Sequence, residues 1–321
     1  MSIFRAILGA AGRVSLRKRM MVAYWFFHTL MAAFVAFPLM GVAISNLSHS
    51  RYGNELLRGF DVSWLVEIIF YTQGNQAPAI LPGVLLAVFL LFLGSTFLAG
   101  GAVRMLVHDG PDYSPRMFYE GCGRYFWRFL RLALYSLFFY GIALILRRML
   151  QKLAERVWGD GMEDHQLIIA GWVVSGVLLL LMALVNTAMD YAKVRLVVDN
   201  SRKSLRAAFG SMRLVLTHPG KTMGVWLVLT IFLAAFVALY LPLSNALQGG
   251  GTGAVLALIV VQQLYVFARV WLRMMAWGAA VELDPFVRPK PEPPPEPVVV
   301  PVTIEPEPPS FPSGAEAGPE V

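Results

Sequence analysis

The sequence contains very little cysteine and very little charge. Cys122 is the only cysteine in 321 residues, which rules out an intrachain disulfide and a multi-cysteine metal site. Charged residues make up 15% of the chain, whereas hydrophobic residues make up 57%. A soluble domain could not bury so much apolar surface. The composition therefore predicts an integral membrane protein.

Motifs for catalysis and for metal binding are also missing. The five histidines are scattered, with no HExxH motif and no pair at metal-binding spacing. No GxSxG motif is present to form a nucleophile elbow. The glycine run at residues 249–253 is not followed by the lysine of a P-loop, and we expect a hairpin turn there. We therefore expect no enzymatic activity, no cofactor and no metal.

Acidic residues are fewer than basic ones, with 20 Asp and Glu against 27 Lys and Arg and a formal net charge of +7. Nucleic-acid binding would require a basic patch interleaved with exposed stacking residues, and the sequence has none. In a multi-pass membrane protein, basic residues instead gather in cytoplasmic loops that face anionic lipid. We therefore expect membrane lipids with anionic headgroups as partners, and no nucleic acid.

Six apolar stretches are long enough to cross about 30 Å of hydrocarbon at about 1.5 Å per residue. Each must be helical, because an open strand in lipid leaves its backbone polar groups unpaired. They predict an all-α integral membrane protein whose six-helix transmembrane domain covers residues 1–282. The predicted spans lie at about 21–45, 81–107, 129–147, 167–189, 222–247 and 253–277.

The distribution of Lys and Arg predicts the orientation of these spans. Most of them precede the first span, follow the last one, or lie in the second and fourth connections, a bias typical of cytoplasmic segments. Both termini are therefore expected in the cytoplasm. The basic residues of the outer connections are Arg51, Arg58, Arg147, Arg148, Lys152 and Arg156.

Two further segments differ from the predicted spans: one is amphipathic and the other is rich in proline and glutamate. Apolar residues recur near helical spacing between residues 46 and 81, which predicts an amphipathic helix on the outer face. Residues 283–321 are rich in proline and glutamate and are expected to form a disordered tail. The tail is either a docking strip for a protein partner or an unstructured solubilising terminus.

A short amphipathic stretch that ends in arginine occurs three times, at residues 9–13, 121–124 and 210–213, each time before two spans. The ends of the hairpins also match, closely at 103–107 and 194–198 and less closely at 270–274. The pattern predicts three parallel hairpin repeats, each preceded by a cytoplasmic interfacial amphipathic helix. The alternative is that positive-inside bias alone makes the units look alike.

Polar residues inside spans are costly in lipid and are the first candidates for a site. Asn186 and Asp190 are four residues apart near the inner end of the fourth span, and we expect Asp190 to pair with Arg269 or Arg273, or with Arg104 in competition. Such a cluster either lines a cavity or headgroup pocket or is a structural clamp. Gln262 and Gln263 point to different faces, so at least one needs a partner. The candidate cluster comprises Arg104, Asn186, Asp190, Arg195, Gln262, Arg269 and Arg273.

Residues 190–198, followed by Ser204, Ala207, Ser211, Arg213 and the pair His218 and Pro219, carry a family resemblance. This region resembles the six-helix membrane domain of bacterial glycerophosphodiester phosphodiesterases and its uncharacterised stand-alone relatives. The catalytic barrel of those enzymes is absent from this sequence. The resemblance implies a bacterial inner-membrane protein with six spans and without catalysis of its own.

These observations favour a non-enzymatic multi-pass protein of the inner membrane that acts as a scaffold, in envelope homeostasis or in contact with lipid. The alternative is a small transporter or lipid translocator that uses a polar cluster at the cytoplasmic ends of the second, fourth and sixth spans. Few polar groups reach the middle of the spans, which disfavours the transporter.

Overall fold

The structure is a computed structural model that describes residues 2–47, 77–108, 110, 113–158, 164–247 and 251–287. The regular structure in these ranges is entirely α-helical. Short breaks separate two helices of 14 residues from the long helices that follow them: Arg17 ends the first, and His218 ends the second before Pro219. The helices are α1 (Ile3–Leu16), α2 (Lys18–Leu47), α5 (Ala77–Val107), α6 (Pro115–Trp158), α7 (Asp164–Val198), α8 (Ser204–Thr217), α9 (Pro219–Leu247) and α10 (Thr252–Val287).

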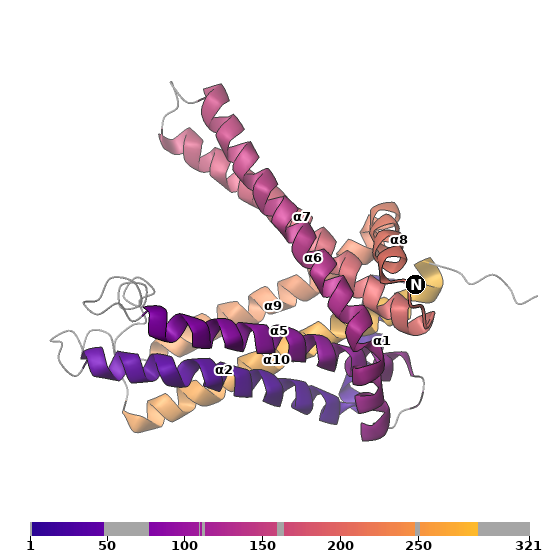
Figure 1. Ribbon diagram of the computed structural model, residues 1–321, viewed down its shortest axis with the longest axis horizontal. Helices are drawn as coiled ribbons and strands as arrows, with labels where there is room; N and C mark the ends of the chain where they lie inside the picture. Colours follow the sequence, from indigo (N-terminus) through magenta and orange to yellow (C-terminus); the bar gives the residue numbers. More distant parts are fainter. Residues whose placement is uncertain are drawn as a thin grey trace, which may run out of the picture. The chain divides into compact units, whose positions relative to one another are not determined.

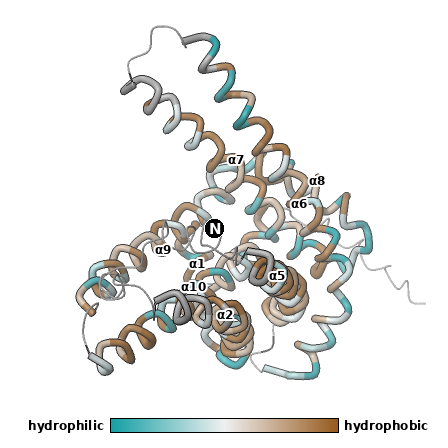
Figure 2. Tube along the Cα trace, turned by 60° about the vertical axis from the view of Figure 1, so that its left-hand side comes forward, coloured by the Kyte–Doolittle hydropathy of each residue, from teal (hydrophilic) through white to brown (hydrophobic). Residues whose placement is uncertain are grey.

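Six of these helices are long and apolar enough to cross a membrane, as the hydropathy of the sequence predicts. At most 28% of the residues in the apolar window of any of them are buried inside the protein, and many large apolar side chains along these helices are exposed. Figure 2 shows hydrophobic residues along most of α2, α5 and α9, with hydrophilic residues concentrated toward the helix ends. This is the architecture of a multi-pass membrane protein.

The long helices alternate in direction, so that α1 and α8 lie at the same end of the bundle (Figure 1). We call this the basal end; α2, α6 and α9 begin there and α5, α7 and α10 finish there. α6 and α7 run side by side and diverge from the other four long helices away from the basal end (Figure 1). The buried hydrophobic core therefore lies mainly toward the basal end, where it includes Val14, Leu106, Phe118, Leu196 and Trp277.

Three pairs of helices approach closely at the basal end. The end of α5 packs on the start of α6, where a Cβ on Gly101 would lie 2.6 Å from the Phe118 carbonyl oxygen. The end of α7 packs on α8, with the Arg195 side chain against Gly210. The end of α10 packs on α1, with Gly278 against Ala10. An ion pair between Arg13 and Glu282 joins α10 to α1 beside this last contact.

The amphipathic stretch before the third span is not a separate helix, which corrects the expectation that each hairpin is preceded by one. α6 runs without a break from Pro115 to Trp158. The physical reason is that no cap or proline interrupts the chain after Pro115, and Gly121 is accommodated by close packing against α5. The other two stretches do form separate helices, α1 and α8.

The last helix runs past the span predicted at 253–277. Its end contacts α1 through Gly278 and Glu282. α10 continues to Val287, and its residues Leu283, Asp284 and Val287 are buried. The rest of the proline-rich tail and most of the predicted amphipathic helix between residues 46 and 81 lie outside the described residues.

Candidate functional site

A cavity of about 610 Å³ lies between the six long helices, and all six contribute to its wall. Its residues come from the basal halves of these helices or from close to their middles. A polar group that contains Asp190 lies nearest the basal end. The wall farther from that end is mostly apolar and includes Leu91, Leu229, Leu233 and Val266. The cavity is therefore polar at one end and apolar at the other.

Asp190 is the centre of the polar group and is 5% exposed. Arg273 binds it through two parallel hydrogen bonds, Nη1 to Oδ2 at 2.8 Å and Nη2 to Oδ1 at 2.9 Å. Lys193 Nζ and Trp277 Nε1 also donate to Oδ1, at 3.2 Å and 2.9 Å. Arg273 Nη1 further contacts Asn186 Oδ1 at 3.4 Å. The predicted pairing of Asp190 with Arg273 is confirmed, and both carboxylate oxygens accept hydrogen bonds.

The ring of Trp277 packs against both cations of this cluster. Its ring lies 5.2 Å from the Arg273 guanidinium carbon and 5.5 Å from Lys193 Nζ, so both cations contact its π face. Tyr24 packs edge-on against Trp277 and donates a hydrogen bond to the Ser95 carbonyl at 3.0 Å. The cluster thereby connects α7 and α10 to α2 and α5. Its geometry is fixed by four helices.

Positive charge exceeds negative charge in the cavity wall. Lys193, Arg269 and Arg273 carry three positive charges there, and Asp190 carries one negative charge. Within the described ranges, Arg269 makes no ion pair or side-chain hydrogen bond. Arg269 is an exposed side chain at the edge of the wall, and a cation without a protein partner attracts an anion. The cavity is thus electrostatically suited to an acidic group.

Two of the hydroxyl groups in the wall have no hydrogen-bond partner in the described part of the chain. These are Thr187 Oγ1 and Tyr191 Oη, on side chains that are 5% and 4% exposed. The other hydroxyls of the wall, apart from the phenol of Tyr24, each donate to a backbone carbonyl three or four residues earlier in the chain, which leaves them satisfied. They belong to Ser95, Thr96, Thr222 and Thr230.

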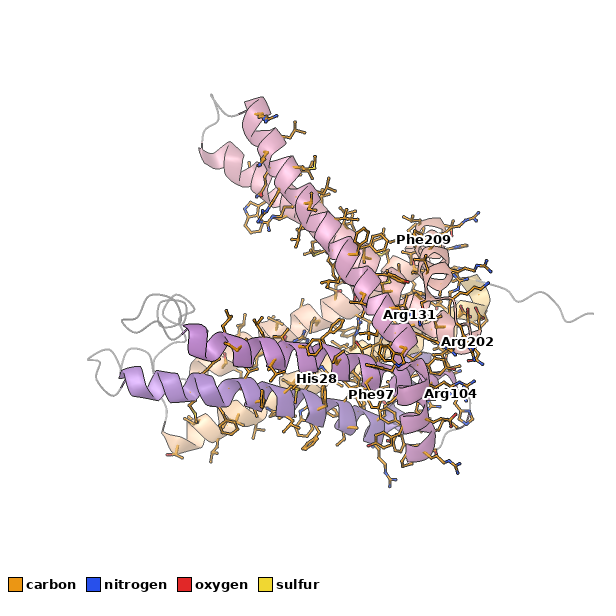
Figure 3. The ribbon with its side chains drawn as sticks, viewed as in Figure 1. His28, Phe97, Arg104, Arg131, Arg202 and Phe209 are labelled. Atoms are coloured by element: carbon orange, nitrogen blue, oxygen red, sulfur yellow. The ribbon has the colours of Figure 1, made fainter. Side chains whose placement is uncertain are left out.

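The structure brings together four of the seven residues predicted for the cluster: Asn186, Asp190, Arg269 and Arg273 all line the cavity. Arg104 lies instead beside Gly121 at the crossing of α5 and α6, near the basal end (Figure 3). Arg195 lies beside Gly210 of α8. The expected convergence of Arg104 and Arg195 on Asp190 is therefore wrong, because the helix crossings occupy their side chains.

The two glutamines of α10 separate as the sequence predicts. Gln263 Oε1 accepts hydrogen bonds from Trp25 Nε1 at 3.1 Å and Thr29 Oγ1 at 3.0 Å, which joins α10 to α2. Gln262 is exposed on the other face of the helix and is not part of the cavity wall. Gln262 therefore does not belong to the candidate site.

Four residues of the site were missed by the sequence analysis: Thr187, Tyr191, Lys193 and Trp277. Lys193 follows Asp190 by three residues, and Trp277 follows Arg273 by four, so helical spacing was a signal for both. Thr187 and Tyr191 adjoin Asn186 and Asp190 in sequence, but nothing in the sequence indicates that their hydroxyls lack partners.

Comparison of the chain with protein-family models, with curated proteins and with solved structures finds no match. The resemblance to the membrane domain of the phosphodiesterases stays a prediction. Among the residues that the structure describes, no three His, Cys, Asp or Glu side chains lie close enough together to hold a metal ion.

Proposed function

We propose that the protein is a non-enzymatic, multi-pass membrane protein that contacts lipid and holds a bilayer lipid in the cavity between its six spans. The cavity carries this proposal, because a polar end and an apolar wall in one space match the two parts of a lipid molecule. All six spans contribute to the wall, so that the bundle as a whole is organised around the bound molecule.

The orientation predicted from the charges fits this proposal. Arg104, Arg131 and Arg202 lie toward the basal end, which we propose faces the cytoplasm of a bacterial cell as the inner-membrane side (Figure 3). α1 exposes Phe4, Leu8 and Leu16, and α8 exposes a similar apolar face, which suits helices that lie in the membrane interface. The polar end of the cavity then lies at the depth of the inner-leaflet headgroups.

This depth favours holding a lipid over moving one across the membrane. A lipid translocator needs polar groups along the whole path of the headgroup. The cavity wall instead becomes apolar toward the middle of the spans, at Leu91, Leu233 and Val266. We therefore place the translocator second.

We further propose that the three hairpins are parallel repeats. The support is the recurrence of one contact: the end of each hairpin packs on the amphipathic stretch of the next, and α10 closes the ring on α1. Arg104, Arg195 and Glu282 occupy the same place in this contact, beside Gly121, Gly210 and Gly9. Val281–Leu283 is then the third copy of the hairpin end, in place of residues 270–274.

A cavity-filling variant tests the lipid-holding function. Val266 lines the cavity, and we expect Val266→Trp to exclude lipid; Leu264, two residues earlier, is 64% exposed and provides Leu264→Trp as a matched control. The readout is the lipid that remains bound per chain after purification in a mild non-ionic detergent, measured by native mass spectrometry. Equal lipid retention by the two tryptophan variants would contradict the proposal.

A further inference from the structure

We propose that the cavity selects a lipid with an anionic phosphate headgroup, bound by Arg269 and Lys193. The proposal rests on the lipid-holding function above and adds the chemistry of the headgroup. The inference does not depend on whether the three hairpins are repeats.

The balance of charge is the first support. Asp190 neutralises one of the three cations in the wall, and its short bidentate contact assigns it to Arg273. Lys193 shares the same carboxylate but uses only one of its three N–H groups in doing so. Arg269 makes no ion pair with any described residue. A ligand with one or two negative charges would therefore compensate the charge that the protein leaves unbalanced.

The direction of the hydrogen bonds is the second support. Asp190 is the only carboxylate in the described wall of the cavity, and both of its oxygens already accept hydrogen bonds. The cations of the wall still have donors to offer, on the guanidinium of Arg269 and the ammonium of Lys193, whereas the remaining acceptor in the wall is the neutral ring nitrogen Nε2 of His28. A phosphate group offers several acceptor oxygens and no obligatory donor, which matches this set.

The hydroxyl groups of the wall do not contribute to the match. Thr187 Oγ1 and Tyr191 Oη have no hydrogen-bond partner in the described protein, but both oxygens are buried and out of reach of a ligand in the cavity. Ser95, Thr96, Thr222 and Thr230 donate to backbone carbonyls three or four residues earlier in the chain. The cations of the wall are therefore the groups that would bind the headgroup.

A phosphate could come from a lipid or from a soluble phosphate compound. The apolar wall decides in favour of the lipid. Leu91, Leu229, Leu233 and Val266 continue the cavity away from the polar end, where a small phosphate compound would leave them without contact. The acyl chains of a lipid would cover these residues, with the headgroup at the basal end.

Binding of three defined compounds to the full chain tests the proposal. The probes are phosphatidylglycerol and phosphatidylcholine with the same acyl chains, and glycerol 3-phosphate as a headgroup without chains. We expect phosphatidylglycerol to bind at least about tenfold more tightly than phosphatidylcholine, whose choline cation would face Arg269 and Lys193. We expect glycerol 3-phosphate not to compete at equal concentration. Native mass spectrometry in non-ionic detergent measures all three.

The outcomes separate this inference from the proposed function. Equal binding of the two lipids would overturn the anionic selectivity while the lipid-holding function stands. No binding of either lipid would overturn both. Competition by glycerol 3-phosphate at equal concentration would overturn the lipid as the source of the phosphate.

Single substitutions locate the site. Arg269→Gln is expected to weaken phosphatidylglycerol binding about tenfold, as the loss of one charge-assisted hydrogen bond does, and Arg269→Lys to restore part of it. Thr187→Val and Tyr191→Phe are expected to leave binding unchanged, because both hydroxyl oxygens are buried out of reach of the cavity.

Arg206→Gln is the matched control, because Arg206 is exposed on α8 and does not line the cavity. We expect it to leave binding unchanged. If Arg206→Gln and Arg269→Gln weaken binding equally, the attraction is a general effect of surface charge and the proposed site is wrong.

Discussion

Asp190 shows how a carboxylate is tolerated within a transmembrane helix. Burial of a lone carboxylate in a low-dielectric environment is strongly unfavourable, but here two cations and an indole N–H all donate to it. In turn, Asp190 allows Arg273 and Lys193 to remain charged inside the bundle. Because each member of the cluster stabilises the others, removal of the carboxylate affects all of them.

We expect Asp190→Ala to lower stability by about 3–5 kcal/mol, the cost of leaving a buried cation unpaired. Trp277→Phe keeps the aromatic ring and removes one hydrogen bond, so its expected cost is about 1 kcal/mol. Thermal unfolding in detergent, followed by circular dichroism, compares the two variants. A smaller loss for Asp190→Ala than for Trp277→Phe would show that the carboxylate is not the centre of the cluster.

Helical spacing in the sequence predicts part of this site. The four-residue spacing of Asn186 and Asp190, and of Arg269 and Arg273, places each pair on one helix face and indicates that the two faces meet. Which arginine binds Asp190 could not be predicted, because that depends on the rotation and crossing of α5, α7 and α10. Arg104 has the right charge and a similar depth but lies at the contact of α5 with α6.

The crossing of α5 and α6 shows how small residues position whole helices. A Cβ on Gly101 would lie 2.6 Å from both the Phe118 carbonyl oxygen and Cys122 Sγ, so the two helices approach within backbone contact. Close approach at glycine is a common basis of helix association in membranes, where the hydrophobic effect between helices is weak. This crossing also fixes the start of α6, and hence Phe129 and Ala133 in the cavity wall.

Gly101→Ala is expected to cost about 1–3 kcal/mol, because the added methyl group must push backbone atoms of α6 away. Gly123→Ala is the matched control on the partner helix, since a Cβ there has no atom within 4 Å, and we expect no loss of stability. Melting temperatures of the two variants in the same detergent provide the comparison. Equal melting temperatures would contradict the close crossing.

The continuity of α6 was not predictable from hydropathy. The stretch at residues 116–131 carries several arginines and looks interfacial when its sequence is considered alone. Packing of Phe118, Cys122, Tyr125 and Phe129 into the core, all buried, keeps the helix continuous through it. By contrast, α8 is followed by Pro219, which begins the next helix and marks a break that the sequence does indicate.

The six long helices define the molecule as a bundle whose ends differ in character. The basal end carries α1, α8 and the helix crossings, and the cavity lies in the adjoining half of the bundle. An inner-leaflet lipid would enter with its headgroup at the basal end, and the orientation of the whole protein therefore decides which leaflet supplies it.

We expect both termini to be cytoplasmic, since most Lys and Arg residues lie in the segments of the basal end. Reporter fusions at the C-terminus and after Leu247 test this orientation. A reporter that is active only in the cytoplasm should be active at the C-terminus and inactive after Leu247. The reverse pattern would place the basal end outside and would overturn the inner-leaflet assignment.

Composition over windows of about 20 residues was enough to predict the six helices that are long and apolar enough to cross a membrane, because transfer into lipid depends on the summed hydrophobicity of a segment and not on its neighbours. Packing between the helices determined the rest: Gln263 faces α2 while Gln262 faces away, and Asp190 binds Arg273. These features depend on the rotation of each helix about its axis, and in lipid that rotation is set by close contacts between helices, of which the sequence shows the small residues but not their partners.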